Sequence, residues 1–284
     1  MSWQDRAVSA KRSRCRQLAW WALAPLLVAA VACGDAERIA TQTFTPATPG
    51  TLTVATSLPA PGFWEGDEPD GLTGGLEYGL AMAMADRWDL ELVVIDVPFD
   101  DLVTGDLRGA DLGLSQITIT DERRRDLAFS TPYYRDDDGV VMAAGEELTD
   151  LKTARERRWG AITDSTQLAL LRDVLRPDVE PEAFADSVAA IDAVARGRVD
   201  AVLVDLSTAL ITTAGRDDLS TVARVVVNGE MAVALPSDSP NVDVVDAAIH
   251  ALTSDGTIGD LVAADLLPHF ETSPDSLPVI RLPE

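Results

Sequence analysis

The sequence of 284 residues contains only two cysteines and two histidines. Cys15 and Cys33 both lie near the N-terminus, so the rest of the chain has no cysteine for a disulfide or a metal site. His250 and His269 are too few and too far apart along the chain for a histidine zinc site or a Ser-His-Asp triad. We therefore expect no metal and no cofactor.

Positive charge is also scarce, because 23 Lys and Arg residues stand against 47 Asp and Glu residues and the formal net charge is −24. A chain this acidic is not expected to bind nucleic acid. It also repels anionic ligands, so a carboxylate-binding site would need a local concentration of positive charge. Arg123, Arg124 and Arg125 supply such a concentration within residues 115–134 (SQITITDERRRDLAFSTPYY).

No long apolar run follows residue 33, and the one before it, residues 18–31, is too short for a comfortable membrane span of roughly 20 residues. Basic residues precede this run, and small residues end it at Val31-Ala32-Cys33. This is the pattern of an export signal.

Cys33 stands where a lipobox places the cysteine that becomes the lipidated N-terminus, although Ala30 replaces the usual leucine. We expect residues 1–33 to be a leader and residues 34–50, rich in Thr, Pro and Ala, to be a flexible linker. The mature chain would then be extracytoplasmic and lipid-anchored to the outer face of the cell membrane. A plain cleaved signal and an uncleaved anchor are the alternatives.

The apolar pattern predicts strands over residues 51–57 and 90–97, with a helix over residues 76–88 between them. Residues 111–115 and 200–205 are short apolar strands that each follow a glycine-containing turn, so the chain builds this unit twice. The alternation favours the α/β class, with mostly parallel sheets covered on both faces by helices. Further elements are expected as helices at 167–175, 185–196, 242–253 and 256–266, and as strands at 221–227 and 231–235.

Ligands of such sheets bind beyond the carboxyl ends of the strands, where Thr118 and Asp205 lie. Thr118 can cap a short helix that contains Arg123, and the planar guanidinium of Arg123 can hold a carboxylate through two parallel hydrogen bonds. Arg124 and Arg125 would point elsewhere on that helix and are expected to be solvated or paired with nearby acids.

Asp205 follows four apolar residues, and burying an unpaired carboxylate is costly. It therefore needs either a protein partner or a cationic ligand, and the residues alone leave both open. If Arg123 and Asp205 come from different lobes, together they match the carboxylate and the ammonium group of an α-amino acid.

Four segments, taken in order, resemble the extracytoplasmic solute-binding proteins of polar amino-acid ABC importers: TLTVATS, GGLEYGLAMAMAD, DLVTGDLRGADLGLSQITITDERRRDLAFSTPYY and GRVDAVLVD. The resemblance covers residues 51–270, and its most specific part is the T-x-T-x-x-R-x-x-x-x-x-F-S-x-P-Y-Y block that begins at Thr118. It implies a periplasmic-binding-protein-like (type II) α/β fold in lipoprotein form, with a hinge between two lobes. Lobe one would be 51–134 plus 229–284, and lobe two would be 135–228.

The resemblance also implies the residues of the ligand site. Thr118 and Arg123 would hold the ligand carboxylate, with help from Gln116. Ser165 and Thr166 of the second lobe would add further hydrogen-bond donors, and Asp205 would bind the ammonium group.

The sequence departs from the family pattern at three places. The family usually has Gly-Phe-Asp-x-Asp where this chain has Gly-Leu-Glu-Tyr-Gly at residues 75–79. Ser57 stands where the family often has an acid that contacts the ligand side chain, which favours a neutral polar or acidic amino acid over lysine or arginine. The segment before Glu65 is one residue longer than usual, and either Phe63 or Trp64 is expected to wall the pocket.

The function implied by the resemblance is capture of an amino acid and its delivery to an ABC importer. The permease and ATPase would be separate chains, and the binding protein would be a monomer without enzymatic activity. One alternative is a cleft enzyme similar to cyclohexadienyl or arogenate dehydratases, in which Glu65, Glu77 or Asp205 would protonate a leaving hydroxyl. Another alternative is a ligand-sensing module for a membrane receptor.

Overall fold

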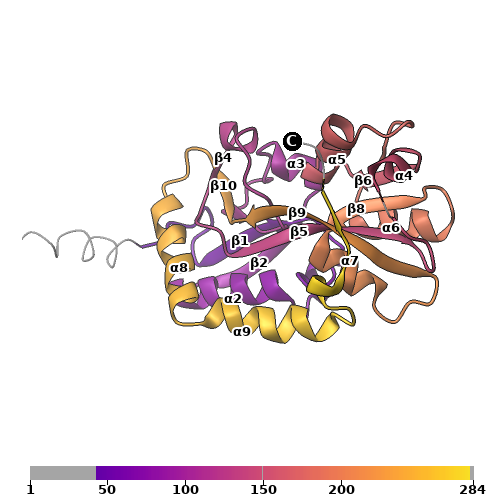
Figure 1. The fold of residues 1–284 in the computed structure, drawn as a ribbon. Helices are drawn as coiled ribbons and strands as arrows, with labels where there is room; N and C mark the ends of the chain where they lie inside the picture. The colour runs from indigo at the N-terminus through magenta and orange to yellow at the C-terminus, as the bar shows by residue number, and fades with distance from the viewer. Residues whose placement is uncertain (1–42, 149, 282–284) are drawn as a thin grey trace, which may run out of the picture.

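The computed structural model describes residues 43–148 and 150–281. The expected leader, Cys33 and residues 34–42 of the expected linker lie outside the described residues. The described residues form two α/β lobes, and the long strands β5 (Tyr134–Ala143) and β9 (Leu219–Met231) run side by side between the lobes (Figure 1). Within these described residues, no helix is long and apolar enough to cross a membrane.

The first described residues pack against the first lobe, whereas the sequence predicted a flexible linker as far as residue 50. Phe44 is 4% exposed and stacks on Trp88, with ring centroids 4.3 Å apart. The backbone N–H of Thr45 donates to Asn241 Oδ1 at 2.8 Å, and that of Ala47 donates to Asp111 Oδ1 at 2.6 Å. These contacts place Phe44 inside the first lobe, which corrects the expected boundary.

The first lobe is built on a five-stranded sheet in the order β2 (Glu91–Asp96), β1 (Thr51–Thr56), β3 (Leu112–Gly113), β10 (Ala234–Pro236) and β4 (Leu127–Phe129). One face packs on α2 (Leu76–Trp88), α8 (Val242–Ser254) and α9 (Thr257–Leu261), and the other packs on α3 (Phe99–Val103) (Figure 1). The helix predicted over residues 76–88 is therefore confirmed as α2. Its apolar face is fully buried at Leu76, Leu80 and Met84. This burial explains why the sequence shows apolar residues at helical spacing.

The second lobe is built on a six-stranded sheet in the order β11 (Val279–Ile280), β9, β5, β8 (Ala201–Asp205), β6 (Trp159–Ile162) and β7 (Glu182–Phe184). Its helices are α4 (Leu151–Arg155), α5 (Thr166–Leu170), α6 (Ser187–Ala195) and α7 (Leu206–Thr213). The helix expected at 167–175 is α5 followed by one π-helical segment, η3 (Leu171–Leu175). Both α5 and α7 begin directly beside the first lobe, so their first residues can reach a ligand held between the lobes.

The two-lobed α/β fold is confirmed, but the sheets are mixed and not mostly parallel. β5 pairs antiparallel with both β8 and β9, and β10 pairs antiparallel with both β3 and β4. The cause is the route of the chain, because it enters the second lobe along β5 and returns along β9 in the opposite direction. These two strands form the hinge connection, and the carboxyl end of β8 lies next to it.

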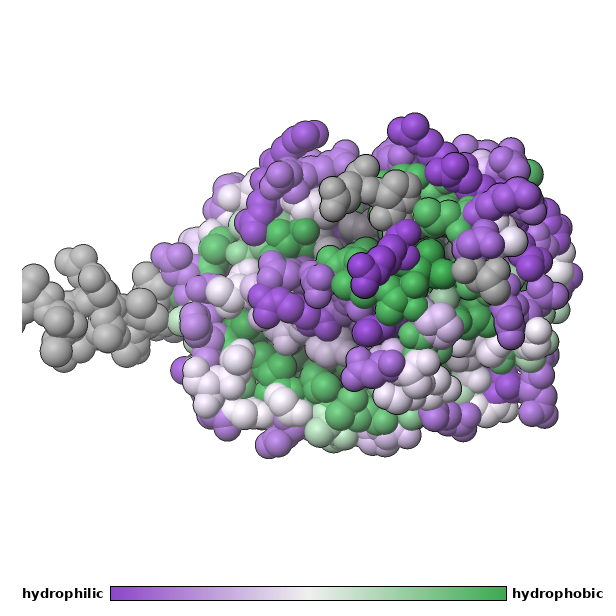
Figure 2. Space-filling view, in the orientation of Figure 1, coloured by the Kyte–Doolittle hydropathy of each residue, from purple (hydrophilic) through white to green (hydrophobic). Residues whose placement is uncertain are grey.

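The C-terminal segment departs from the expected boundary of the first lobe. After η4 (Val262–Leu266), η5 (Leu267–His269) and η6 (Pro274–Ser276), the chain crosses to the second lobe, where β11 pairs in parallel with β9. Leu277 packs with Leu206 and Leu210 of α7, which holds this segment in place. Figure 2 shows hydrophobic residues gathered over the middle of this face, between more hydrophilic ends. The remaining short helices are η1 (Pro69–Gly71) and η2 (Arg123–Arg125).

Candidate functional site

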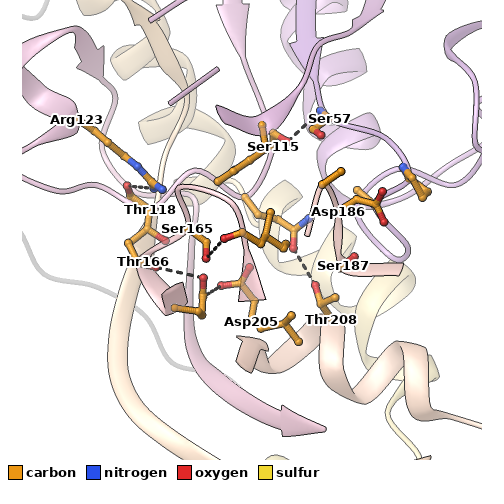
Figure 3. A pocket seen from close by; sticks show the side chains of 18 residues that line it. Ser57, Ser115, Thr118, Arg123, Ser165, Thr166, Asp186, Ser187, Asp205 and Thr208 are labelled. Carbon is orange, nitrogen blue, oxygen red and sulfur yellow. Dashed lines mark hydrogen bonds between the residues drawn. The ribbon is translucent and has the colours of Figure 1, made fainter. Parts of the chain in front are cut away.

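The candidate site is a cavity of about 40 Å³ between the lobes (Figure 3). Residues of the first lobe that line it include Ser57, Gln116, Thr118 and Arg123, and residues of the second lobe include Ser165, Thr166, Asp205 and Thr208. A cavity of this size holds only a few water molecules. The lobes are therefore closed on each other, and they must separate for an amino acid to enter.

Arg123 reaches from the first lobe to the second. Its Nη1 donates to the carbonyl oxygen of Thr118 at 2.8 Å, and its Nη2 donates to the carbonyl oxygen of Asp164, in the other lobe, at 3.0 Å. The guanidinium lies 5.5 Å from the ring centroid of Phe99, and the residue is 7% exposed. Burial lowers the pKa of Arg123 to about 10, so the side chain remains cationic at neutral pH.

The two neighbouring arginines differ sharply from Arg123, because both are exposed. The guanidinium of Arg124 lies 5.8 Å from the ring centroid of Phe129, on the outside of the lobe. In the part of the chain that the structure describes, neither Arg124 nor Arg125 forms an ion pair with Glu122 or Asp126. Only Arg123 lines the cavity between the lobes.

Gln116 is the second direct link between the lobes. Its backbone is left-handed, with φ of 52°, and its N–H donates to Glu77 Oε1 at 2.6 Å. Its side-chain oxygen accepts a hydrogen bond from Thr208 Oγ1 of α7 at 2.9 Å (Figure 3). Ser115, Gln116 and Thr118 therefore line the cavity from the first lobe, while Ile117 lies in the core of that lobe.

In the second lobe, Ser165 and Thr166 line the cavity at the start of α5. The Ser165 hydroxyl accepts from the backbone N–H of Leu168 at 3.1 Å and donates to the carbonyl oxygen of Ile162 at 2.7 Å. That hydroxyl is thus engaged as the helix N-cap. Thr166 Oγ1 lies 3.4 Å from Gln167 Oε1, which leaves Thr166 the freer of the two donors.

Asp205 has a protein partner, but that partner is uncharged. Gln167 Nε2 donates both to Asp205 Oδ1 at 2.9 Å and to Asp138 Oδ1 at 2.7 Å. Asp138 lies directly opposite Asp205 across the β5–β8 pairing, and Asp136 is two residues away on β5. Among the described residues, none of these three carboxylates forms an ion pair, which leaves the negative charge of this region open to a cationic group.

The three carboxylates have raised pKa values, and burial is the largest cause in each case. The pKa of Asp136 is raised to about 6 and that of Asp138 to about 7. The pKa of Asp205 is raised well above its ordinary value by burial and by its two acidic neighbours, against which Arg123 acts in the opposite direction. An ammonium group beside Asp205 would favour the ionised carboxylate and so oppose the effect of burial on its pKa.

A larger hollow of about 350 Å³ adjoins the cavity on the side of the β5–β9 hinge. It shares Thr118, Thr166 and Asp205 with the cavity between the lobes. Its other lining residues include Asp136, Asp138 and Glu230, so its wall is acidic. Within residues 43–148 and 150–281, no group of three or more His, Cys, Asp or Glu residues is arranged to hold a metal ion.

The expectation for Phe63 and Trp64 is corrected by the structure. Phe63 is fully buried and Trp64 is 1% exposed, and both belong to the core of the first lobe. Trp64 instead donates its indole N–H to Glu77 Oε2 at 2.7 Å. The aromatic residue at the cavity is Phe99, while Ser57 lines the cavity as expected.

Three further residues of the site were missed by sequence reasoning. They are Asp138, Gln167 and Thr208. A weak signal existed for Asp138, because three consecutive acids precede Gly139 in an otherwise apolar strand. Gln167 follows directly on the predicted Ser165-Thr166 pair, whereas Thr208 has no local signal in the sequence and lines the cavity because α7 begins directly after β8.

Comparison with known proteins gives the family. A model of the bacterial extracellular solute-binding proteins, family 3, matches residues 52–264. The L-arginine-binding protein of Pseudomonas aeruginosa is 30% identical over 147 residues, which is 48% of this chain and 54% of that protein. The L-cystine-binding protein TcyJ of Escherichia coli (strain K12) is 28% identical over 216 residues, which is 74% of this chain and 80% of that protein.

Solved structures agree with this match. An amino acid ABC transporter substrate-binding protein from Streptococcus pneumoniae, bound to L-arginine, superposes with a TM-score of 0.68 at 27% identity, over 75% of this chain and 92% of that one. An ancestral amino acid-binding protein that is a precursor of cyclohexadienyl dehydratase has the same fold, with a TM-score of 0.68 at 20% identity over 76% of this chain and 95% of that one. This chain therefore belongs to the bacterial extracellular solute-binding proteins, family 3.

Proposed function

We propose that this protein captures an α-amino acid between its lobes and delivers it to an ABC importer formed by separate chains. The observation that carries the proposal is the position of Arg123 and Asp205, which line one cavity from opposite lobes. A carboxylate needs a cation and an ammonium group needs an anion, and an α-amino acid presents both on one carbon. No single lobe holds both charges, so the ligand itself favours closure.

The guanidinium of Arg123 has five N–H donors, and two of them are used by Thr118 and Asp164. Three donors remain for a ligand carboxylate. Asp205 accepts from Gln167 through Oδ1, and its Oδ2 has no donor among the described residues. That oxygen is the position we assign to the ligand ammonium group. Thr166 and Gln116 would complete the hydrogen bonds around the ligand.

The acidic hollow changes the expectation for the ligand side chain. Ser57 favoured a neutral polar or acidic side chain, but Asp136, Asp138 and Glu230 line the space beside the cavity. An acidic side chain placed there would be repelled, whereas a cationic or hydrogen-bond-donating side chain would be stabilised.

A thermal-shift screen of the twenty amino acids, followed by calorimetry, tests the ligand class. We expect arginine, lysine and glutamine to raise the melting temperature more than glutamate and aspartate do. Asp138→Asn, which keeps a similar shape, should narrow the difference between arginine and glutamate. Glutamate binding as tightly as arginine and glutamine would contradict the assignment of the hollow, and absence of binding by all twenty would contradict the proposed function.

The anchor proposed for the N-terminus rests on the sequence pattern at Val31-Ala32-Cys33. We expect the wild-type chain to incorporate a labelled fatty acid and to fractionate with membranes. Cys33→Ala should abolish the label, because the thioether to the lipid is made by that sulfur. A wild-type chain that takes up no lipid and is wholly soluble would show that the leader is a plain cleaved signal.

One observation favours the enzymatic alternative, since Asp205 has a raised pKa and could hold a proton in the cavity. A dehydratase would use such an acid on a hydroxyl leaving group. Incubation with prephenate and with arogenate, followed by absorbance of an aromatic product, tests this alternative directly. We expect no product, because in the proposed function Asp205 binds the ammonium group of the ligand and does not donate a proton to a leaving group.

A further inference from the structure

Glu77 is the most deeply buried acid of the first lobe. It is the second residue of α2, its exposed fraction is 0%, and it is surrounded by the apolar core that contains Leu76 and Leu80. Glu77 does not line the cavity between the lobes. A carboxylate in such a place is stable only if donors surround it.

Three donors from three different segments meet at this carboxylate. Trp64 Nε1 donates to Oε2 at 2.7 Å, the backbone N–H of Gln116 donates to Oε1 at 2.6 Å, and the Tyr133 hydroxyl also donates to Oε1. Trp64 lies in the segment after β1, Gln116 follows β3, and Tyr133 directly precedes the hinge strand β5. Glu77 thus ties the helix α2 to the wall of the cavity and to the start of the hinge.

Of the residues that donate to Glu77, Gln116 is the one whose side chain contacts the other lobe. Gln116 has a φ of 52°, which is unfavourable for a residue with a side chain, so this conformation needs support. From this conformation its side-chain oxygen accepts from Thr208 Oγ1 across the cavity at 2.9 Å (Figure 3). Thr208 is 3% exposed and lies on α7, directly after Asp205 and β8.

We propose that Glu77 is a positioning residue for closure: its carboxylate holds Gln116 in the left-handed conformation from which Gln116 bonds Thr208 of the opposite lobe. This inference rests on the proposed function, because closure matters when a ligand is captured. Glu77 touches no ligand, and it acts on affinity only through Gln116. A merely structural Glu77 would stabilise the first lobe and leave the link to Thr208 unchanged.

A double-mutant cycle distinguishes these two roles. Glu77→Gln and Thr208→Val are each expected to weaken binding of the tightest ligand of the screen by about tenfold or more. Since both act on the same link, the double variant should be weakened by little more than the stronger single variant. Independent effects that multiply in the double variant would overturn the proposal.

Trp64→Phe is the matched control, because it removes a donor from the other oxygen of Glu77 and leaves the bond to Gln116 in place. It should lower the melting temperature of the ligand-free protein but change affinity far less than Glu77→Gln does. An equal loss of affinity in both variants would mean that general destabilisation of the lobe explains the effect.

The amide resonance of Gln116 supplies a test that needs no ligand. A backbone N–H bonded to a carboxylate resonates strongly downfield, so Glu77→Gln should move the Gln116 amide proton upfield, and Thr208→Val should shift the Gln116 side-chain amide. If Glu77→Gln does not fold, Glu77→Asp serves the same measurement, because the shorter side chain lengthens the bond. An unmoved Gln116 amide would refute the positioning role, whether or not the screen finds a ligand.

Discussion

Replacement of Arg123 by alanine is expected to weaken ligand binding by roughly 10²- to 10⁴-fold. The guanidinium is buried and lines the cavity from the first lobe, so its removal leaves the ligand carboxylate buried without a cation. Loss of one partner of a buried ion pair costs about 3–5 kcal/mol, and each 1.4 kcal/mol is tenfold in affinity. Asp205→Ala should have an effect of similar size through the ammonium group. Isothermal calorimetry with the tightest ligand of the screen measures both.

Arg125→Ala is the control that the chain itself provides. Arg125 is two residues away, is exposed and does not line the cavity. Its replacement should change affinity by less than about twofold, in keeping with the small effect of most surface substitutions. Equal losses in Arg123→Ala and Arg125→Ala would mean that the arginine run acts only through its general positive charge.

Arg123 also has a structural contact that must be separated from ligand binding. Its Nη2 donates to the carbonyl oxygen of Asp164 across the lobes, so Arg123→Ala removes one link of the closed form. The ligand-free melting temperature reports this contribution, and the affinity reports the ligand contact. Arg123→Lys keeps the charge but loses the planar pair of donors, so it should bind more weakly than wild type and more tightly than Arg123→Ala. Unchanged affinity in Arg123→Ala with a normal melt would contradict the clamp.

The helices and strands that carry a strong periodic pattern could be read from the sequence. α2 begins and ends where the spacing of Leu76, Leu80 and Met84 predicted, because one face of this helix is buried and the other is solvated. β9 could not be read in this way. The sequence predicted strands at 221–227 and 231–235, whereas β9 runs without a break over Leu219–Met231 and the second strand, β10, begins only at Ala234. The apolar pattern of β9 breaks at residues 228–230, where the strand leaves one lobe for the other, although its pairing with β5 continues.

The charges of the site were predictable, but their surroundings were not. Asp205 was expected because it lies at a strand end, and Arg123 because it lies on a short helix that follows a strand end. Both also resemble family positions. The contacts of Gln167 with Asp138 and Asp205 join residues 29 and 38 positions apart, and no local pattern encodes them. Phe63 and Trp64 were placed at the cavity because their segment resembles the family's aromatic turn, yet the turn that carries them folds inward onto α2. A carbon added at Gly75 would come within 2.3 Å of the Phe63 carbonyl oxygen, which shows how closely that turn approaches the helix.

The ligand-free protein is expected to become less stable as the pH rises from about 4 to about 7. Burial raises the pKa of Asp136 to about 6 and raises those of Asp138 and Glu77 to about 7. Between the ordinary pKa of these acids and the raised values, the folded state binds more protons than the unfolded state. The free energy of unfolding therefore falls with increasing pH across this interval.

The expected size of this effect is large. Each unit of pKa shift corresponds to roughly 1.4 kcal/mol. Above pH 7 these groups together therefore lower the free energy of unfolding by on the order of several kcal/mol. For a chain of this size that amounts to a fall in melting temperature of roughly 10 °C between pH 5 and pH 8. Calorimetric melts at half-unit pH steps measure it. Asp138→Asn, which cannot ionise, should make the pH dependence shallower, and a melting temperature that is flat or rises over this interval would contradict the raised pKa values.

The same protons predict how ligand binding depends on pH. At pH 5 a proton already neutralises part of the acidic cluster around Asp205, so an ammonium group must displace it in order to bind. At pH 8 more of the carboxylates in the cluster are ionised. The ammonium group can then neutralise their negative charge without displacing a proton. The rise in melting temperature caused by a saturating ligand should therefore be greater at pH 8 than at pH 5. Asp138→Asn should reduce that difference, because it removes one of the carboxylates that compete for the proton. A ligand-induced shift that is equal at the two pH values in wild type would mean that the ammonium group binds elsewhere, away from Asp205 and its acidic neighbours.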